Sequence, residues 1–353
     1  MMKIHPQFQL QNHSFSNTEE FLKYVKTHWP SHISFLRQWL DNNDFIIAHT
    51  SGSTGKPKPV KISKKAMVKS AEKTINFFSL SPQTKALLNL SSDFIAGKMM
   101  WVRAFTGGWN LFVSSPDNQS IRQILQKEDF DFGAMVPLQL IANLNDIHRF
   151  KKLIIGGGAL SQRYIDKIKN IETAVFATYG MTETITHIAV KPLNKKAGLY
   201  KTDLFENVFA ALPGVSFDID KRECLRIKTS FLEENIIQTN DIVELIDSHH
   251  FEWKGRFDNV INSGGIKLQA EEIEKKLTPY IDKSFFISAL PDDKLGEKVV
   301  LIIETETPFH FTMEEVLSKY EIPKEIYTIP KFEYTSSGKI QRKKTMEKIK
   351  RRD

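Results

Sequence analysis

The most constraining feature of this chain is a regular alternation of short apolar runs and helical patterns between Asp44 and Tyr179. Runs such as FIIAH, ALLNL, FGAMV and KLIIGG are apolar on both faces, which is typical of strands covered by helices on both sides. Strands that alternate with helices form βαβ units. The pattern therefore predicts a largely parallel sheet, with loops at the carboxyl ends of its strands available for ligands. Ser63 is the expected N-cap of a helix over residues 63–78.

The pattern changes after Met181, where VSFDID, CLRIKTS, NIIQTN and IVELID alternate as half-buried antiparallel strands do. Beyond Gly255 we expect a helix at AEEIEKKL, strands at FFISAL and VVLIIET, a helix at MEEVLSKY and a short strand at EIYTIP. The predicted fold is thus α/β with two domains. A large N-terminal domain, residues 1–255, would hold the mainly parallel sheet and a β-rich subdomain at about 185–255, and a small mobile α+β domain would follow at residues 256–353.

Composition narrows the class of protein. The chain is 41% hydrophobic and 26% charged, and it holds no apolar run near the roughly 20 residues that span a bilayer. The first residues do not form a secretory signal, so we expect a cytoplasmic protein without membrane insertion. Cys224 is the single cysteine, which excludes intramolecular disulfides and a cysteine-based zinc site. We expect Cys224 to be a buried structural thiol.

The net charge of +7 is compatible with binding either to polyanions or to phosphorylated small substrates. Much of the excess lies in the last fifteen residues, KIQRKKTMEKIKRRD, where no aromatic residue is interleaved to stack on bases. We therefore interpret this segment as a solvated basic tail and expect no nucleic-acid partner.

The most specific local motif is the loop from His49 to Pro59, HTSGSTGKPKP, which follows the apolar run FIIAH. Glycine permits close backbone approach to a phosphate, while hydroxyl groups and lysine ammonium groups supply donors and charge. The loop is not a Walker A motif, because Thr50 stands where that motif needs glycine and Pro57 follows Lys56. The sequence nevertheless predicts a phosphate-binding loop.

This loop resembles the phosphate-binding signature of the acyl-adenylate-forming enzymes, and further motifs of that superfamily follow in its order. Gly156–Leu160, GGGAL, is similar to the loop that packs on adenine, and Thr178–Thr184, TYGMTET, to its most diagnostic motif. Asp241 matches the aspartate that holds the ribose hydroxyl groups. Residues 255–274 resemble the hinge and first loop of a mobile C-terminal domain, and Ser337–Ile340, SGKI, the motif with the catalytic lysine.

The resemblance implies that a carboxylate attacks the α-phosphate of ATP and that the acyl group then passes to coenzyme A, with Mg²⁺ as cofactor. Lys339 would bridge the carboxylate and the α-phosphate, Thr182 would contact that phosphate, and Glu183 would hold Mg²⁺. The residues implied in ATP or AMP binding are Thr50, Ser51, Gly52, Ser53, Thr54, Gly55, Lys56, Gly157, Gly158, Ala159, Thr178, Tyr179, Gly180, Met181, Asp241 and Arg256.

The second half-reaction would need Lys339 to withdraw, which the family achieves by rotating the small domain. By resemblance, Asp258 is the hinge residue, because a few boundary residues can absorb such a change. Gly264 and Gly265 would lie close to the pantetheine of CoA.

The short N-terminal part and the segment FIAGKMMWVRA most resemble the o-succinylbenzoate–CoA ligases of menaquinone synthesis. Such a substrate carries a second carboxylate that must not react, and a cation in an apolar pocket would receive it. Lys98 and Arg103 are the candidates.

Three alternatives remain open from the sequence: another short acyl- or aryl-CoA ligase, an enzyme that charges a carrier protein, and a non-catalytic nucleotide- or nucleic-acid-binding protein. The expected partners are a small carboxylic acid, ATP and CoA, and the protein would be a monomer or a homodimer.

Overall fold

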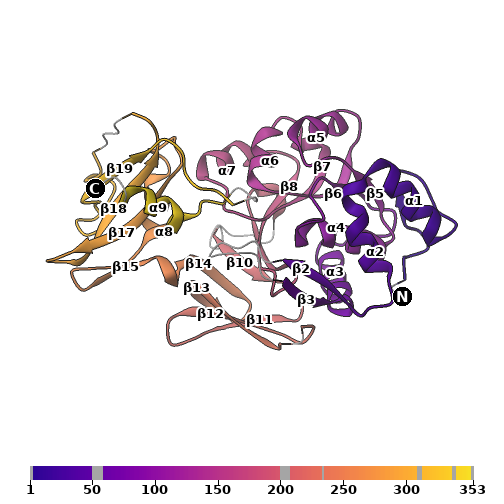
Figure 1. Ribbon diagram of the computed structural model, residues 1–353, viewed down its shortest axis with the longest axis horizontal. Helices are drawn as coiled ribbons and strands as arrows, with labels where there is room; N and C mark the ends of the chain where they lie inside the picture. The colour runs from indigo at the N-terminus through magenta and orange to yellow at the C-terminus, as the bar shows by residue number, and fades with distance from the viewer. Residues whose placement is uncertain are drawn as a thin grey trace. The chain divides into compact units, whose positions relative to one another are not determined.

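The computed structural model describes residues 3–49, 59–198, 207–232, 234–307, 312–335 and 339–350 (Figure 1). The chain divides into two compact units. The first contains residues 1–160, 164–216 and 228–237, and the second contains residues 161–163, 217–227 and 238–353. Both combine helices and strands, so the predicted α/β class is confirmed. Within the described part of the chain, no helix has the length and apolar character needed to cross a membrane.

A mainly parallel sheet forms the centre of the first unit, in the strand order β1-β5-β4-β6-β7-β8-β9-β10. Neighbouring strands run parallel from β1 to β8, and β9 and β10 are antiparallel additions, so the predicted parallel sheet is confirmed. The strands are β1 (Gln9–Leu10), β4 (Lys85–Leu88), β5 (Asn110–Val113), β6 (Phe130–Met135), β7 (Phe150–Ile155), β8 (Ala174–Gly180), β9 (His187–Pro192) and β10 (Val208–Ala211).

Helices cover both faces of this sheet, which explains why its strands are apolar on both sides. One core joins strand residues such as Leu87 and Leu153 to Ile121, Leu140 and Ile168 of three helices. On the other face the ring of Phe78 packs against strand residues Phe132 and Phe176. The helices are α1 (Thr18–His28), η1 (Pro30–His32), α2 (Ile33–Leu40), α3 (Lys64–Phe77), α4 (Ile95–Gly107), α5 (Asn118–Leu125), α6 (Pro137–Ala142), η2 (Ile147–Arg149), α7 (Gln162–Ile168) and η3 (Lys195–Ala197).

The run FIIAH is a strand, β2 (Phe45–His49), but its predicted place in the parallel sheet is wrong. It pairs antiparallel with β3 (Pro59–Ser63) in a separate two-stranded sheet. The sequence did not predict β3, because its segment PVKIS begins with proline and alternates with polar residues over only five positions. Ser63 then caps α3 as predicted, since its Oγ accepts a hydrogen bond from the backbone N–H of Ala66 at 3.4 Å.

The second unit begins with the antiparallel strand order β14-β13-β12-β11. The predicted strands NIIQTN and IVELID are one continuous strand, because the polar residues between them keep the extended alternation. Cys224 on β12 is buried, as predicted, and burial raises the pKa of its thiol. The strands, which reach slightly into residues of the first unit, are β11 (Val215–Ile219), β12 (Cys224–Thr229), β13 (Ile236–Asp247) and β14 (His250–Arg256).

A second sheet follows in the same unit, with the order β16-β15-β18-β17 and β19 paired to β18. Its strands and helices form an α+β arrangement, as predicted. Their bounds are η5 (Phe257–Asn259), β15 (Val260–Ser263), β16 (Ile266–Gln269), α8 (Ala270–Leu277), β17 (Phe285–Asp292), β18 (Gly296–Glu304), β19 (Glu325–Ile329) and α9 (Arg342–Lys350).

Two predictions about this sheet's surroundings are wrong. The segment MEEVLSKY makes only turns, with the N–H groups of Val316 and Leu317 both donating to the carbonyl of Met313. Pro323 follows closely and cannot continue a helix. The predicted solvated basic tail is instead largely the helix α9, because Met346 and Ile349 bury their side chains in an apolar cluster with Phe332.

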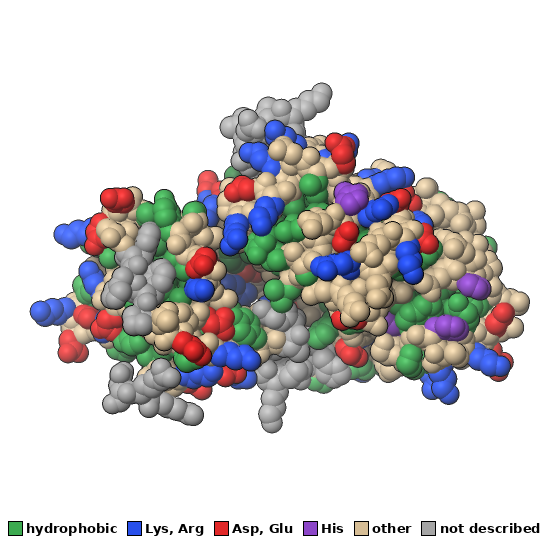
Figure 2. All heavy atoms as spheres, turned by 90° about the horizontal axis from the view of Figure 1, so that it is seen from above, with side chains coloured by type: hydrophobic (Ala, Val, Ile, Leu, Met, Phe, Trp, Pro, Cys, Tyr) green, Lys and Arg blue, Asp and Glu red, His purple; other side chains and the backbone are tan. Residues whose placement is uncertain are grey.

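Surface charges are mixed rather than segregated. On the face shown in Figure 2, Lys and Arg side chains lie interspersed with Asp and Glu side chains. Among the described residues, ion pairs join Lys151 to Asp131 at 2.7 Å and Lys196 to Glu172 at 2.7 Å. The described side chains on the visible face therefore form no continuous basic stripe of the kind that follows a nucleic-acid backbone.

Candidate active site

Two predicted motifs meet at one edge of the first unit's sheet. Strands β7 and β8 are parallel neighbours, so Gly157–Ala159 and Thr178–Glu183 both lie at their carboxyl ends. Thr178 joins them, because its Oγ1 donates to the carbonyl of Ile155 at 3.0 Å. A Cβ at Gly156 would lie 2.8 Å from that same Oγ1. Glycine at the start of the loop thus permits its backbone to pass against Thr178, and the edge is where α/β sheets bind ligands.

The TYGMTET segment leaves β8 in a turn fixed by its own backbone. A Cβ at Gly180 would lie 2.4 Å from the carbonyl oxygen of Thr186, so this position needs glycine. Thr184 is fully buried, and its Oγ1 accepts from the N–H of Met181 at 2.9 Å. Ile185 has a φ of +68°, a left-handed conformation that is unfavourable for a β-branched residue. The turn therefore holds Thr182 and the exposed Glu183 outward while the residues after them are buried.

Tyr179 lies partly buried in β8, with its ring 5.8 Å from the ring of Phe209 on β10. Such an aromatic surface beside the sheet edge suits the predicted role of Tyr179 in binding ATP or AMP, because its ring can stack on a base. Gly157, Gly158 and Ala159 are exposed on the neighbouring loop.

Arg103 on α4 is buried, with 2% of the residue exposed. Its Nη2 donates to Thr186 Oγ1 at 2.9 Å and faces His187 Nδ1 at 3.4 Å. No carboxylate pairs with Arg103 within the described ranges, and its buried Nε has no hydrogen-bond partner there. Burial lowers the pKa of Arg103 to about 9, so the guanidinium stays charged at neutral pH. A buried cation without a counter-ion is costly, and an anionic ligand would remove that cost.

His187 is held neutral beside this cation. Burial, and secondly the charge of Arg103, lower the pKa of His187 well below its usual range. Because guanidinium can only donate, Nδ1 of His187 is the acceptor and Nε2 carries the proton toward Thr74 Oγ1, 3.4 Å away. Neutral neighbours therefore leave the charge of Arg103 uncompensated.

Lys98, also on α4, has a different environment. Its ammonium donates to the backbone carbonyl of Ser92 and lies 5.6 Å from the ring centre of Phe35. Burial lowers the pKa of Lys98, and Asp93 opposes that shift. Ser92 Oγ also contacts His32 Nδ1 at 2.6 Å, so Lys98 lies in a buried polar cluster next to α2. Arg103 instead contacts Thr186, two residues after the TYGMTET motif.

In the second unit, Asp241 and Arg256 lie opposite each other on β13 and β14. Asp241 is buried, and its Oδ1 accepts from Trp253 Nε1 at 3.1 Å and Arg256 Nη1 at 3.4 Å. Thr239 Oγ1 accepts from the N–H of Asp241 at 3.1 Å. The sheet register therefore places the predicted ribose-binding carboxylate of Asp241 next to Arg256, which is also predicted to bind ATP or AMP.

The backbone at Lys339 and Ile340 pairs with the backbone at Thr335 and Tyr334. The N–H of Thr335 donates to the carbonyl of Lys339 at 2.8 Å, and Tyr334 forms an antiparallel bridge with Ile340. Burial of the ammonium, and secondly the charge of Arg256, lower the pKa of Lys339, while Asp241 opposes the shift. Because the residue as a whole is exposed, we expect its ammonium to remain charged at neutral pH. Three predicted residues that are distant in sequence, Asp241, Arg256 and Lys339, are thus electrostatically coupled.

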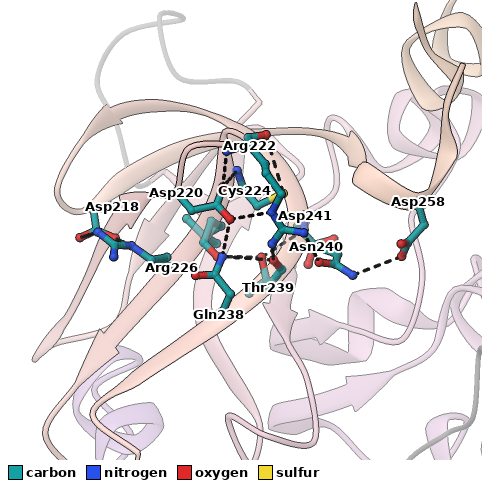
Figure 3. A network of polar contacts seen from close by, with 11 residues as sticks. Asp218, Asp220, Arg222, Cys224, Arg226, Gln238, Thr239, Asn240, Asp241 and Asp258 are labelled. Carbon is teal, nitrogen blue, oxygen red and sulfur yellow. Dashed lines mark hydrogen bonds and ion pairs between the residues drawn. The ribbon is translucent and has the colours of Figure 1, made fainter. Parts of the chain in front are cut away.

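The predicted hinge and CoA-loop residues also belong to the second unit. Asp258 is exposed, and its Oδ2 accepts from Asn240 Nδ2 at 3.5 Å (Figure 3). The same Oδ2 accepts from Arg256 Nη2 at 3.1 Å. Gly264 and Gly265 form the two-residue turn between β15 and β16, with φ values of +61° and +82°. A type I′ hairpin turn needs such values, so turn geometry alone explains both glycines and their predicted contact with CoA stays a prediction.

A magnesium ion would find one carboxylate here, that of the exposed Glu183. Across the described segments no group of three or more His, Cys, Asp or Glu side chains is arranged to hold a metal. Mg²⁺ is commonly bound by one or two carboxylates together with substrate phosphates, so Glu183 fits that mode of binding. The predicted phosphate-loop residues, from Thr50 to Lys56, lie outside the described residues.

Sequence reasoning missed several side chains that hold the predicted ones. Thr186 binds Arg103, Trp253 binds Asp241, and Asn240 binds Asp258. Thr186 lies two residues after a recognised motif and Asn240 directly precedes Asp241, so both could have been found by that proximity. Trp253 becomes a neighbour of Asp241 only through the register of β13 with β14, which the sequence did not predict.

Comparison with known proteins agrees with this geometry. Residues 7–217 match the family described as AMP-binding enzyme. The chain is 35% identical to an acyl-CoA synthetase (AMP-forming)/AMP-acid ligase II-like protein from Dyadobacter fermentans, covering 90% of this chain and 93% of that one, with a TM-score of 0.60. It is 26% identical to the 2-succinylbenzoate–CoA ligase of Listeria monocytogenes, covering 89% of this chain and 72% of that protein.

The O-succinylbenzoate Coenzyme A Synthetase of Bacillus subtilis, solved with ATP and a magnesium ion, is 18% identical with a TM-score of 0.74, over 85% of this chain and 69% of that one, which supports the fold. The chain belongs to the AMP-binding enzyme family. The predicted identity as an AMP-forming acyl-CoA synthetase is thereby confirmed.

Proposed function

We propose that this enzyme activates o-succinylbenzoate as its acyl-adenylate and transfers the acyl group to coenzyme A. In the first step a carboxylate oxygen of the acid forms a bond to the α-phosphorus of ATP, and pyrophosphate leaves. In the second step the CoA thiol loses its proton, its sulfur bonds to the acyl carbon, and AMP leaves.

The roles of the residues follow from the charges that develop. The first step brings two anions together and builds charge on pyrophosphate, so cations must approach the reacting oxygens. Lys339 would supply that positive charge, and Mg²⁺ on Glu183 would neutralise the phosphates. Thr182 would contact the α-phosphate, while Asp241 and Arg256 would bind the ribose.

One observation supports a diacid as substrate: Arg103 is a buried guanidinium without a carboxylate partner in the described part of the chain. A carboxylate is a good partner for the fork of guanidinium donors, and the orphan Nε of Arg103 is one such donor. Thr186 ties Arg103 to the loop after β8. We therefore propose Arg103, in preference to Lys98, as the residue that receives the unreactive carboxylate of o-succinylbenzoate. The relative from Listeria bears the name of a ligase for this acid.

The test is AMP release that requires both CoA and an added acid. We expect o-succinylbenzoate to be the preferred member of a panel that also holds benzoate, medium-chain fatty acids and malonate. Preference for another acid would replace this substrate with a different acyl- or aryl-CoA ligase activity. Charging of a carrier protein in place of CoA would identify the other alternative, and absence of acid-dependent pyrophosphate release would exclude a ligase.

The selectivity claim is tested with Arg103→Met, which keeps the volume and removes the charge. The KM for o-succinylbenzoate should rise about 10- to 100-fold, as expected for a lost hydrogen bond between charged groups. The KM for ATP should not change. Lys98→Met serves as the comparison, and a larger rise in that variant would assign the second carboxylate to Lys98.

A further inference from the structure

Glu271 lies where strand β14 leads into the segment before β15. Its side chain, on the first turn of α8, is 9% exposed. Its Oε2 accepts from the backbone N–H of Arg256 at 3.4 Å, and its Oε1 accepts from Asn259 Nδ2 at 2.5 Å. One carboxylate therefore binds both ends of the four-residue segment that contains Asp258.

Gly255 makes this approach possible. A Cβ at that position would lie 2.6 Å from Glu271 Oε2, much closer than atoms in contact can lie. Any side chain at residue 255 would displace the carboxylate from the backbone of Arg256. Because Gly255 on β14 has no side chain, the carboxylate of Glu271 on α8 has room to reach the backbone.

The same carboxylate also lies close to the segment that carries Lys339. Arg342, three residues after Lys339, has its Nη2 3.6 Å from Glu271 Oε1 and 2.8 Å from Glu274 Oε2. Its Nη1 donates to the carbonyl of Ile287 at 3.2 Å. Arg342 therefore fastens the start of α9 to α8 and β17, next to the carboxylate that holds the hinge segment.

We propose that Glu271 is a positioning residue that holds the segment from Arg256 to Asn259 and, through Arg342, the chain that leads back to Lys339 in the conformation that the first half-reaction needs. Arg256 precedes Asp258 in the chain and Glu271 follows it. A rotation at Asp258 therefore breaks the hydrogen bond between the backbone N–H of Arg256 and the carboxylate of Glu271. The bond thus favours the conformation that the first half-reaction needs. This role rests on the proposed function, because it concerns the step in which Lys339 acts.

The test compares the two half-reactions. In Glu271→Ala, acid-dependent exchange of pyrophosphate into ATP should fall about 10- to 100-fold, the range for lost hydrogen bonds to a charged group. Thioester formation from supplied acyl-adenylate should be retained. Gly255→Ala should reproduce the same division, since it displaces the carboxylate and keeps Glu271. Glu272→Ala, one residue along the same helix, is the matched control and should behave as the parent.

A second measurement does not depend on activity. Hydrogen exchange at the amide of Arg256 should become faster in Glu271→Ala, with global stability unchanged, and Glu271→Gln should restore part of the protection. Unchanged exchange at Arg256, or equal loss in both half-reactions, would overturn the proposal. A parent protein without ligase activity would refute the proposed function alone, because the exchange experiment would still decide whether Glu271 holds the hinge segment.

Discussion

The two units hold their predicted site residues by different means. In the first unit the backbone does so: Gly180 and Thr184 fix the turn after β8, and the nearby cation Arg103 has only neutral partners in the described structure. In the second unit charged side chains do so, as with Arg256 between Asp241 and Asp258. A backbone turn has one conformation, whereas ion pairs can exchange partners. From this comparison we infer that the predicted site residues of the first unit are held in one place, whereas those of the second unit can exchange partners.

The largest expected effect tests the charge of the second unit. Lys339→Ala should lower the rate of adenylation about 10²- to 10³-fold, which is the scale for removal of one group that stabilises transition-state charge. Thioester formation from supplied acyl-adenylate should survive, because Lys339 has withdrawn in that step. Pyrophosphate exchange measures the first step, and Lys343→Ala on the exposed side of α9 is the control. An adenylation rate equal to that of the parent would show that Lys339 has no catalytic role.

The second prediction tests the rigidity of the first unit. Gly180→Ala forces a methyl group against the backbone of Thr186, so the first unit should lose about 1 to 3 kcal/mol of stability, as overpacked positions do. Denaturant unfolding followed by tryptophan fluorescence measures it. Gly158→Ala should cost much less stability, because within the described part of the chain its Cβ would meet only Pro137 Cγ, at 3.8 Å. Equal stability of the two variants would mean that the turn adapts.

Acid should weaken the first unit. Burial lowers the pKa of His32 to about 4, so between about pH 6.5 and 4 the unfolded chain binds a proton that the folded unit does not. Stability from this group is complete above that window and is lost as the pH falls through it, on the order of 2 kcal/mol. His32→Asn keeps an acceptor for Trp101 and should make the stability of the first unit less dependent on pH. His148→Asn, at an exposed site, should show the same pH dependence as the parent. The free energy of unfolding, measured by hydrogen exchange at several pH values, tests both variants.

The smallest effect has the opposite sign and belongs to the second unit. Burial raises the pKa of Glu274 to about 7, although Arg342 opposes the shift. Between about pH 4.5 and 7 the folded unit therefore binds the extra proton, and stability falls as the pH rises through that window. Glu274→Gln should raise the free energy of unfolding by on the order of 1 kcal/mol at pH 8 and should leave it unchanged at pH 4.5. A loss of stability in Glu274→Gln at pH 8 would contradict this assignment, and Glu272→Gln is the control.

The sequence predicted most of the first unit's framework because its signals are local. Apolar runs on both faces predicted β4 to β8, and the hydroxyl group of Ser63 predicted the start of α3. Local signals also misled. The lysines of residues 342–350 concealed the buried Met346 and Ile349, and the polar residues of β3 concealed its pairing with β2.

The candidate site was predictable only where motifs carried a resemblance. Asp241 and Lys339 are almost a hundred residues apart, and no periodicity in the sequence relates them. Their electrostatic coupling depends on the register of β13 with β14 and on the backbone pairing of Thr335 with Lys339. Arg103 was predicted as one of two candidate cations, but its lack of a carboxylate partner within the described residues is a property of packing, which the sequence did not reveal.

The parallel order of β4 to β8 has a consequence for synthesis of the chain. Each parallel pair joins strands that are separated by a whole crossover, so native contacts of the sheet are distant in sequence and form slowly. During translation, β4 emerges before its partner β6, and β7 before its partner β8. The apolar faces of β4 and β7 remain uncovered until those partners are made. We expect nascent chains that end before Gly180 to depend on chaperones, and those that extend past β9 to become resistant to aggregation.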